Sequence, residues 1–472
     1  MTDGFDDALA YLDRLVALPL PGRRERVLER TRLLLDRVGD PHERFAALHV
    51  TGSSGKGSTA TLAAAILRAA GLRVGLFTSP HLEDIGERIV VDGRPLPRAA
   101  WAPLLDKLRP TIDALVAGSK AGGGLGRPTR MQVLWPLAAL YFAAQEVDIA
   151  VVEVGMGGKY DPTAVNTARV GVVTNVSLEH SGVLGASLAE IAHHKGAIAP
   201  PGGVLVTAVR QPEALDAIIE ECRQRDAALW RVVPSEGLSH SAAPNEGVPP
   251  PAAVEDALAR GGDRVVSFES IGGRVRVAAP GQVYDDLTVG LLGRHQHANA
   301  ACAVAAVDAL TKLGVVDIGV DAVRDGVASA RIAGRLEQVD DDPPTWLDGA
   351  HNPDAARTLA MALRDLFPER SLVLLLGVLE DKDSDAMVDA LAPLARAVVV
   401  TEPPWAGRNG RGAYVARRVG RHIDDCVYIR DPEEALSQAR AMARARGALL
   451  VVTGSLILVG FARSLLVGVD SA

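Results

Sequence analysis

Residues 47–59 read Ala-Leu-His-Val-Thr-Gly-Ser-Ser-Gly-Lys-Gly-Ser-Thr, and they join a short apolar run to the helical stretch 60–70. A strand that enters a helix through a glycine-rich loop directs backbone N–H groups and the positive end of the helix dipole towards an anion. Lys56 can reach the outer phosphates of a nucleotide, and the Ser58 hydroxyl can hold Mg²⁺. The stretch therefore predicts a phosphate site for a nucleoside triphosphate.

The order of residues in this loop limits which class of nucleotide-binding protein the chain can belong to. In Gly52-x-x-Gly55-Lys56-Gly57-Ser58, one residue separates the lysine from the hydroxyl, and the earlier glycine of the strict P-loop pattern is absent. This spelling argues against ordinary GTPases and kinases. A turn that is rich in glycine and serine by chance is the alternative interpretation.

Lysine is scarce in this chain, which makes each lysine informative. Only seven of the 50 basic residues are lysine, so arginine serves wherever a general surface cation suffices. An ammonium group is a compact charge whose pKa shifts readily and whose neutral amine is nucleophilic, which a guanidinium cannot imitate. Four lysines lie beside Gly- or Asp-containing junctions of the kind that form sites: Lys56, Lys159, Lys195 and Lys382.

Length and composition bound the class of protein. A chain of 472 residues is too long for one core and should form two or three domains. The hydrophobic content of 48%, the charged content of 23% and the net charge of −8 are those of a globular protein without an electrostatic reason to bind nucleic acid. The acidic N-terminus and the lack of a membrane-length apolar run predict a cytoplasmic protein that binds no membrane. The three cysteines are unpatterned and indicate neither disulfides nor a cysteine metal site.

The order of apolar and helical segments predicts an α/β fold. Short apolar runs such as 148–154, 170–174, 372–377 and 449–453 alternate with longer helical patterns, which is typical of parallel sheets with helical crossovers. The sequence predicts a P-loop domain with a parallel sheet over residues 1–332, followed by a smaller doubly wound, Rossmann-like domain over residues 333–472. Alternating runs at 265–289 around Gly272-Gly273 predict β-hairpins at a sheet edge.

Three further residues are candidates for the chemistry. Glu153 closes a buried strand before Gly155-Met-Gly-Gly158, and a carboxylate there requires a cation or hydrogen-bond donors. His180 follows the next strand along the chain, so parallel pairing would bring it to the same sheet edge. Lys195 lies in the helical stretch 187–199. Its amine could take up CO₂ to form a carbamate and so add two anionic oxygens to a metal site, or it could be an ordinary surface lysine.

In order, the motifs of the chain resemble those of folylpolyglutamate synthase and dihydrofolate synthase, in the Mur-ligase superfamily. The resemblance spans residues 10–462 and rests on these segments: Thr51-Gly-Ser-Ser-Gly-Lys-Gly-Ser58, Thr78-Ser-Pro-His-Leu82, Glu87-Arg-Ile89, Glu153-Val-Gly-Met-Gly-Gly158, Glu179-His180, Lys195, Gly293-Arg-His295, Asn299-Ala-Ala301, Gly334-Arg-Leu-Glu337, Asp348-Gly-Ala-His-Asn-Pro353, Asp381-Lys-Asp383 and Gly454-Ser455.

The resemblance implies an enzyme that uses ATP to form an amide bond with glutamate through an acyl phosphate. It implies ATP and Mg²⁺ as cofactors, with two Mg²⁺ sites and K⁺ as a further candidate ion, and small molecules as the only partners of a monomer. By position, it implies catalytic roles for Lys56, Lys195, His180 and His351. It implies metal ligation by Ser58, Glu153, His180 and a carbamylated Lys195. Nucleotide contacts are implied at Gly52, Ser53, Ser54, Gly55, Lys56, Gly57, Ser58, Thr59, Asn299, Arg335, Asp348 and His351, the last three acting from the second domain.

The chain departs from the family pattern beside the expected pterin. Pro128-Thr-Arg-Met-Gln132 stands where many relatives carry a Thr-Phe-Phe-Glu-like stretch. Arg130 and Met131 would cover a ring face less rigidly than two phenylalanines, and Gln132 would offer an amide to the ring N–H groups. The acid is dihydropteroate, a reduced folate or both. One alternative keeps the ligase chemistry for another carboxylic acid, and others are a non-catalytic nucleotide-binding subunit and a P-loop kinase or NTPase.

Overall fold

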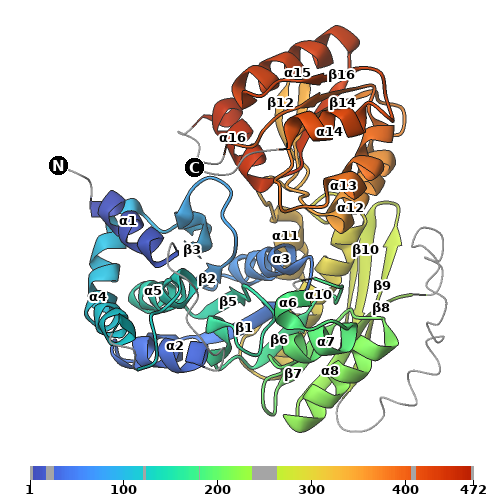
Figure 1. Ribbon diagram of the computed structural model, residues 1–472. Coiled ribbons are helices and arrows are strands. Elements are labelled where there is room, and N and C mark those ends of the chain that lie inside the picture. Colours follow the sequence, from blue (N-terminus) through green and yellow to red (C-terminus); the bar gives the residue numbers. More distant parts are fainter. Residues whose placement is uncertain are drawn as a thin grey trace. The chain divides into compact units, whose positions relative to one another are not determined.

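The computed structural model describes residues 4–16, 26–120, 124–179, 181–235, 263–404 and 411–468. They form two compact units (Figure 1). Unit 1 takes the described residues within 1–81, 86–290 and 296–330, and unit 2 takes those within 82–85, 291–295 and 331–472. No helix among these described ranges is long and apolar enough to cross a membrane.

Unit 1 is built on an 11-stranded sheet in the order β11-β10-β9-β8-β7-β6-β1-β5-β2-β3-β4. Its strands are β1 (Ala46–Thr51), β2 (Val74–Phe77), β3 (Ile89–Val91), β4 (Arg94–Pro95), β5 (Ile149–Glu153), β6 (Val170–Val173), β7 (Val204–Thr207), β8 (Ala228–Pro234), β9 (Arg264–Ile271), β10 (Arg274–Ala279) and β11 (Gln282–Leu287). The stretch from β9 to β2 is parallel, and antiparallel strands extend it at both edges. The central strands β5 and β6 are buried along their whole length, which explains why they are apolar except for Glu153 at the end of β5.

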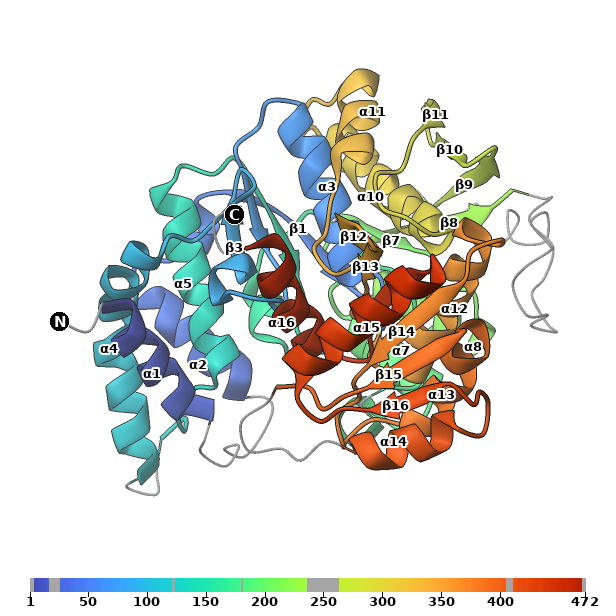
Figure 2. The same ribbon diagram turned by 90° about the horizontal axis from the view of Figure 1, so that it is seen from above.

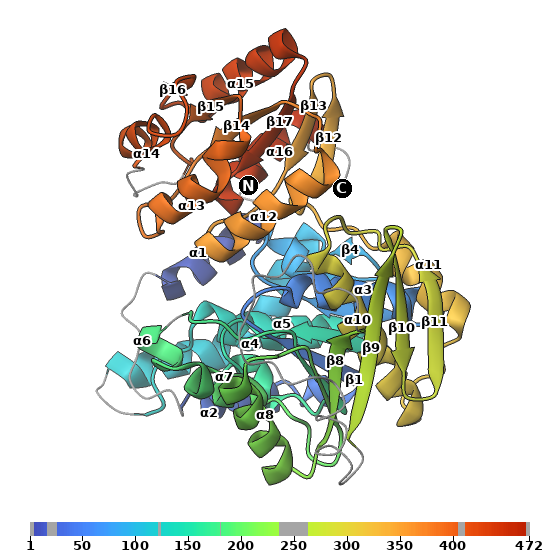
Figure 3. The same cartoon turned by 90° about the vertical axis from the view of Figure 1, so that its right-hand side faces the viewer.

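Helices cover both faces of this sheet. They are α1 (Gly4–Val16), α2 (Arg26–Asp36), α3 (Lys56–Ala69), α4 (Arg98–Lys120), α5 (Arg130–Ala144), α6 (Ser181–Leu184), α7 (Leu188–Gly196), α8 (Pro212–Gln224), α10 (His295–Lys312) and α11 (Val320–Ser329), with 3₁₀ turns η1 (Pro41–Glu43), η2 (Ile85–Arg88) and η3 (Pro162–Val165). Figure 3 shows β8 to β11 side by side, next to α10 and α11. The predicted hairpins at 265–289 are confirmed as β9, β10 and β11. Gly272 and Gly273 form the first turn with φ of 55° and 83°, angles that favour glycine.

Unit 2 is a smaller α/β unit (Figure 2). Its six-stranded sheet has the strand order β12-β13-β17-β14-β15-β16. Its elements are β12 (Glu337–Asp341), β13 (Pro344–Leu347), α12 (Pro353–Leu366), β14 (Leu372–Leu376), α13 (Ser384–Leu391), η4 (Ala392–Leu394), β15 (Ala397–Val400), α14 (Gly412–Val419), β16 (Cys426–Tyr428), α15 (Pro432–Arg446), β17 (Leu449–Thr453) and α16 (Leu456–Val467). All strand pairs except β12–β13 are parallel.

Alternate residues of the unit 2 strands feed two separate cores. On β14, Leu372, Leu374 and Leu376 pack into a core with side chains of α12, α13 and α14, whereas Val373 and Leu375 pack with side chains of α15 and α16. A strand buried on both faces carries no polar alternation, so its sequence is continuously apolar. The predicted α/β fold with a second, doubly wound sheet is therefore confirmed.

Candidate active site

Four neighbouring parallel strands of unit 1 end at the same edge of the sheet. In the order β6-β1-β5-β2, they lead into Thr174, the phosphate loop at Gly52, Glu153 and Thr78. Because ligands of open α/β sheets bind beyond the carboxyl ends of the strands, this edge is where a nucleotide site is expected.

The phosphate loop has the backbone that its glycines allow. Gly52 has φ of 150° and Gly55 has φ of 76°, and the latter directly precedes the first residue of α3. A Cβ on Gly52 would lie 1.8 Å from Thr174 Oγ1, and one on Gly55 would lie 2.4 Å from Asn299 Oδ1. Both glycines are therefore required by close neighbours as well as by their φ angles.

Asn175 holds the phosphate loop from the end of the neighbouring strand β6. Its Oδ1 accepts hydrogen bonds from the backbone N–H groups of Ser53 (3.0 Å) and Ser54 (2.8 Å), and its Nδ2 donates to Ser54 Oγ (2.6 Å). Thr174 Oγ1 donates to Ser54 O (2.6 Å). These bonds explain how small hydroxyl residues serve at both positions of the loop.

Lys56 lies across the loop that precedes it. Its Nζ donates to Gly52 O (2.9 Å) and to Ser53 O (3.3 Å), so the ammonium group is held at the first turn of α3. Ser58 is buried. Thr59 is also buried, and its backbone N–H donates to Gly55 O (2.9 Å). The cationic Lys56 at a helix N-terminus is suited to a bound polyphosphate.

Glu153 is a buried carboxylate at this edge, with 3% of its surface exposed. Its Oε2 accepts a hydrogen bond from the backbone N–H of Ser79 (2.8 Å). Its two oxygens lie 3.7 and 3.8 Å from the Cβ position of Gly57, which places the carboxylate against the first turn of α3 beside Ser58. A carboxylate and a hydroxyl are oxygen ligands of the kind that Mg²⁺ prefers, so these residues fit the predicted ion. Among the described residues, no group of three His, Cys, Asp or Glu side chains forms a metal site.

Lys195 is almost completely buried, with 1% of its surface exposed. Its Nζ donates to Glu179 Oε1 (2.8 Å). Burial lowers the pKa of the Lys195 amine to about 8, Glu179 opposes that shift, and the nearby charge of Lys56 adds to it. The structure thus makes Lys195 a buried amine near the phosphate loop. His180, the other candidate on this segment, lies outside the described residues.

Gly158 allows the helix of Lys195 to pack on the loop that follows Glu153, and Gly157 allows a side chain of α6 to do so. A Cβ on Gly158 would lie 2.6 Å from His194 O and 3.2 Å from Lys195 O, and one on Gly157 would lie 2.7 Å from the Leu184 side chain. The backbone N–H of Lys159 donates to His194 O (2.9 Å). Helix α7 and the loop 155–159 are therefore packed backbone against backbone.

Met131 lies beside this loop, on the first turn of α5. A Cβ on Gly155 would lie 3.2 Å from Met131 Cε and 3.2 Å from Asp161 Oδ2. Arg88 Nη1 donates to Met131 Sδ (3.6 Å). Asp161 is buried, which raises its pKa, while hydrogen bonds from Thr163 and from the backbone of residues 155 and 156 counteract that rise.

The prediction for Gln132 is wrong. The residue is fully buried, and its side chain forms the capping box of α5 with Thr129. Its Oε1 also accepts from Arg30 Nε (3.3 Å), and its Nε2 donates to Val27 O (2.8 Å). The amide is occupied by helix α2 and by its own helix start, so it cannot meet a pterin ring. Arg130 forms an ion pair with Asp13 (3.1 Å).

Asn299 is the second contact to the phosphate loop that comes from a distant segment. It lies in the second turn of α10, and its Oδ1 approaches Gly55 as described above. Its Nδ2 donates to the buried Gln296 Oε1 (2.8 Å), which fixes the orientation of the amide. The structure thus places Asn299 beside Gly55 of the phosphate loop.

Within unit 2, three predicted residues gather at the carboxyl end of β13. Asp348 accepts from the backbone N–H groups of Ala350 (3.0 Å) and Leu336 (3.1 Å). Burial raises the pKa of Asp348, and the charge of Arg335 opposes that shift. His351 Nδ1 lies 2.9 Å from Gly349 O and must carry the hydrogen, because a carbonyl oxygen can only accept.

The remaining predicted cations are more exposed. Lys382 Nζ pairs with Asp381 (3.1 Å), and Asp383 caps α13 through the backbone N–H of Ala386 (3.1 Å). Lys159 Nζ lies 5.6 Å from the centre of the Tyr160 ring. Of the predicted segment Asp381-Lys-Asp383, the structure shows that Asp383 is the N-cap of α13.

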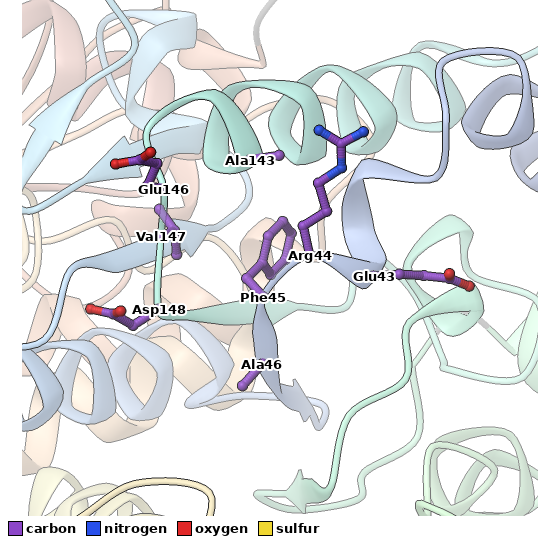
Figure 4. Close-up of a pocket in the computed structure, with 8 residues that line it drawn as sticks. All are labelled: Glu43, Arg44, Phe45, Ala46, Ala143, Glu146, Val147 and Asp148. Atoms are coloured by element: carbon purple, nitrogen blue, oxygen red, sulfur yellow. The ribbon is translucent and has the colours of Figure 1, made fainter.

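A surface hollow in unit 1 lies at the other end of the sheet (Figure 4). It is formed at the amino ends of β1 and β5, whereas the phosphate loop follows the carboxyl end of β1. The hollow is thus separate from the candidate active site. Eight residues line it: Glu43, Arg44, Phe45, Ala46, Ala143, Glu146, Val147 and Asp148.

Sequence reasoning did not identify Arg88 or Asp161 as members of this site. Arg88 occurs inside Glu87-Arg-Ile89, a motif that carries the family resemblance, and Asp161 follows the motif Glu153-Val-Gly-Met-Gly-Gly158. Their burial beside Met131 and Gly155 arises from contacts between distant segments. The only signal in the sequence was the motif itself.

Comparisons with known proteins agree with this geometry. Residues 334–456 match the family model for the Mur ligase glutamate ligase domain. The chain is 31% identical to the dihydrofolate synthase/folylpolyglutamate synthase of Bacillus subtilis, over 91% of this chain and 92% of that protein. It is 36% identical to the protein of the same name from Mycobacterium tuberculosis, over 79% and 74% of the two chains.

Solved structures give the same result. The M. tuberculosis folylpolyglutamate synthase complexed with ADP has a TM-score of 0.82 and 30% sequence identity, and the match covers 99% of both chains. A complex of FPGS with AMPPCP and folate has a TM-score of 0.76 and 28% identity, over 98% of this chain and all of that one.

Proposed function

The chain belongs to the dihydrofolate synthase/folylpolyglutamate synthase family, and we propose that it joins glutamate to a pterin acid at the edge formed by β6, β1, β5 and β2 in unit 1. The enzyme is an ATP-dependent ligase of that family. One observation supports the assignment of the site: the phosphate loop and the buried Glu153 lie at one strand edge, and the charge of Lys56 in that loop acts on the buried Lys195.

The proposed reaction has two steps. A carboxylate oxygen of the acid attacks the γ-phosphorus of ATP, ADP leaves, and an acyl phosphate forms. The amine of glutamate then attacks the acyl carbon, phosphate leaves, and the amine loses its proton. Both steps need charge neutralisation and in-line positioning more than covalent help from the protein.

The residues of unit 1 supply that environment. Lys56 and the N–H groups of the loop would hold the phosphates, and Asn299 would contact the nucleotide. Ser58, Glu153, His180 and Lys195 would hold Mg²⁺, a Lewis acid that neutralises charge on the phosphoryl oxygens. Met131 and the adjoining loop would cover the ring of the acid.

We further propose that unit 2 contributes Arg335, Asp348 and His351 to nucleotide binding, with His351 as a catalytic residue. Their gathering at one strand end of a doubly wound sheet supports this role, because ligands of such sheets bind there. The enzyme would be monofunctional if it accepts only dihydropteroate or only reduced folates, and bifunctional if it accepts both. The ligation chemistry is the same in each case. The cytoplasmic location and the monomeric state stay predictions.

The proposed function is tested by ATP-dependent transfer of labelled glutamate to dihydropteroate, to tetrahydrofolates and to a panel of other carboxylic acids. We expect label in at least one pterin acid and none without ATP. If another acid is ligated and no pterin acid is, the folate assignment fails while the ligase assignment survives. If no acid is ligated but ATP binds, a non-catalytic nucleotide-binding subunit is favoured.

We expect Lys195 to carry a carbamate in the active enzyme. In this reaction the neutral Nζ attacks the carbon of CO₂ and loses a proton, so the product is an anion with two oxygens. Only 1% of the surface of Lys195 is exposed, and this burial favours the neutral amine. The Nζ atom points towards Glu179, to which it donates a hydrogen bond. Lys195→Ala should be folded and inactive, short carboxylates should partly restore its activity, and Lys195→Arg should not recover it.

Intact mass measurement under CO₂ and ¹³C NMR with labelled bicarbonate check this expectation. Lys312→Ala is the matched control, because Lys312 lies on α10 away from the loop and should neither change the signal nor the rate. An unmodified amine together with full activity in CO₂-depleted buffer would contradict the carbamate.

A further inference from the structure

Arg88 is a buried arginine whose charge has no ionic partner in the described part of the chain. Only 7% of its surface is exposed. Its Nε donates to His81 Nδ1 (2.7 Å), and its Nη1 donates to Met131 Sδ (3.6 Å). A histidine nitrogen that accepts a hydrogen bond belongs to a neutral ring, and a thioether is a weak, uncharged acceptor.

Arginine is rarely buried to this extent without a paired anion, because removing its charge from water is unfavourable. Burial and the charge of the nearby Arg130 lower the pKa of Arg88 to about 10, which leaves it charged at neutral pH. The charges of Glu153 and Glu87 oppose that shift in part. The site is therefore arranged for an anion that the protein itself does not supply.

The neighbours of Arg88 indicate which anion that is. On one side lies Met131, which we have placed against the ring of the acid. Met131 Cε also lies 3.2 Å from the Cβ position of Gly155, two residues after Glu153, the candidate metal ligand whose charge acts on Arg88. In the proposed function, Met131 covers the ring of the acid and Glu153 holds Mg²⁺ beside the reacting phosphate. The part of the acid that lies between these two residues is its reacting carboxylate.

We propose that Arg88 binds the reacting carboxylate of the acid substrate, and the acyl phosphate that replaces it. This inference rests on the proposed function, because it takes the acid and its product from there. Arg88 takes part in no covalent step. Its planar guanidinium matches a carboxylate or a phosphate, and its remaining donors would orient the attacking oxygen.

Arg88→Met tests the proposal, with the acid that the wild-type enzyme ligates and the primary carboxamide of the same acid as a competitive inhibitor. We expect kcat/KM for the acid to fall by about 10- to 100-fold, the range of charge-assisted hydrogen bonds. The inhibition constant of the uncharged carboxamide and the Kd for ATP should stay unchanged. A variant that still prefers the carboxylate as strongly as wild type would overturn the proposal.

Arg30→Met is the matched comparison for a structural role. Arg30 is also buried, at 1% exposure, but its Nη1 donates to Leu125 O (2.7 Å) and its Nε to Gln132. The loss of Arg30 leaves Leu125 O and Gln132 Oε1 without this donor, so Arg30→Met should lower the melting temperature. The variant should keep the wild-type preference for the carboxylate over the carboxamide. Arg88→Met should keep the wild-type melting temperature or raise it, because it removes an unpaired buried charge.

The outcomes separate this proposal from the proposed function. If the wild-type enzyme ligates a non-pterin acid, the folate assignment fails, and the same acid and its carboxamide still test Arg88. If Arg88→Met melts at a much lower temperature, as expected for Arg30→Met, Arg88 has a structural role and the proposal is overturned. Arg88→Lys, which keeps the charge but loses the planar fork, should recover part of the carboxylate preference.

Discussion

Replacing Lys56 by alanine is expected to lower the rate of ligation by about 10²-fold or more, the scale measured for single groups that stabilise developing charge. Lys56 is held at the start of α3 by Gly52 O and Ser53 O, so its ammonium group is in place before a nucleotide binds. The variant loses two hydrogen bonds within one loop, from Lys56 Nζ to Gly52 O and to Ser53 O, so we expect the fold to remain intact. The expected defect therefore lies in phosphoryl transfer and in the affinity for ATP.

Steady-state glutamate incorporation and the Kd for ATP measure this effect. Lys107→Ala is the matched control, since Lys107 is an exposed lysine on α4. It should retain the wild-type rate. Near-normal turnover by Lys56→Ala would mean that the phosphate loop of unit 1 is not the ATP site.

Glu153→Gln should cause a loss of similar size. The amide keeps the volume of the side chain, and its oxygen can still accept from the Ser79 N–H, but it removes the negative charge beside the first turn of α3. If Glu153 ligates Mg²⁺, the variant should need a much higher Mg²⁺ concentration and remain slow at saturation. Glu153→Ala should be at least as slow.

The comparison uses rates at increasing Mg²⁺ for wild type, Glu153→Gln and Glu213→Ala. Glu213 is an exposed glutamate at the start of α8, so its loss should leave the Mg²⁺ dependence unchanged. Circular dichroism checks that the variants fold. A Glu153→Gln enzyme with the wild-type rate and Mg²⁺ dependence would exclude Glu153 as a metal ligand.

The parts of this site that follow local rules were predictable from the sequence. A glycine-rich loop between a strand and a helix defines the position of Lys56, and a carboxylate at the end of an apolar strand identifies Glu153. The alternation of strands and helices likewise predicts both sheets. Each of these inferences depends only on residues that are close in the sequence and on the regular geometry of strands and helices.

The missed features depend on contacts between distant segments. Gln132 looked like a substrate contact, but helix α2 approaches it with Arg30 and the carbonyl of Val27. The burial of Arg88 and its contact with Met131 depend on how its segment packs against α5. No local pattern carries that information.

The close packing of Gly158 on α7 has a consequence for the choice of ion. Because backbone meets backbone there, the spacing between the segments of Glu153 and Lys195 cannot be adjusted by a change of side-chain rotamer. Mg²⁺ requires oxygen ligands at about 2.0–2.1 Å, whereas Ca²⁺ takes more ligands at about 2.3–2.6 Å in flexible geometry. A rigid spacing of this kind would select cations by size, so that Gly158 would influence ion selectivity without touching the ion.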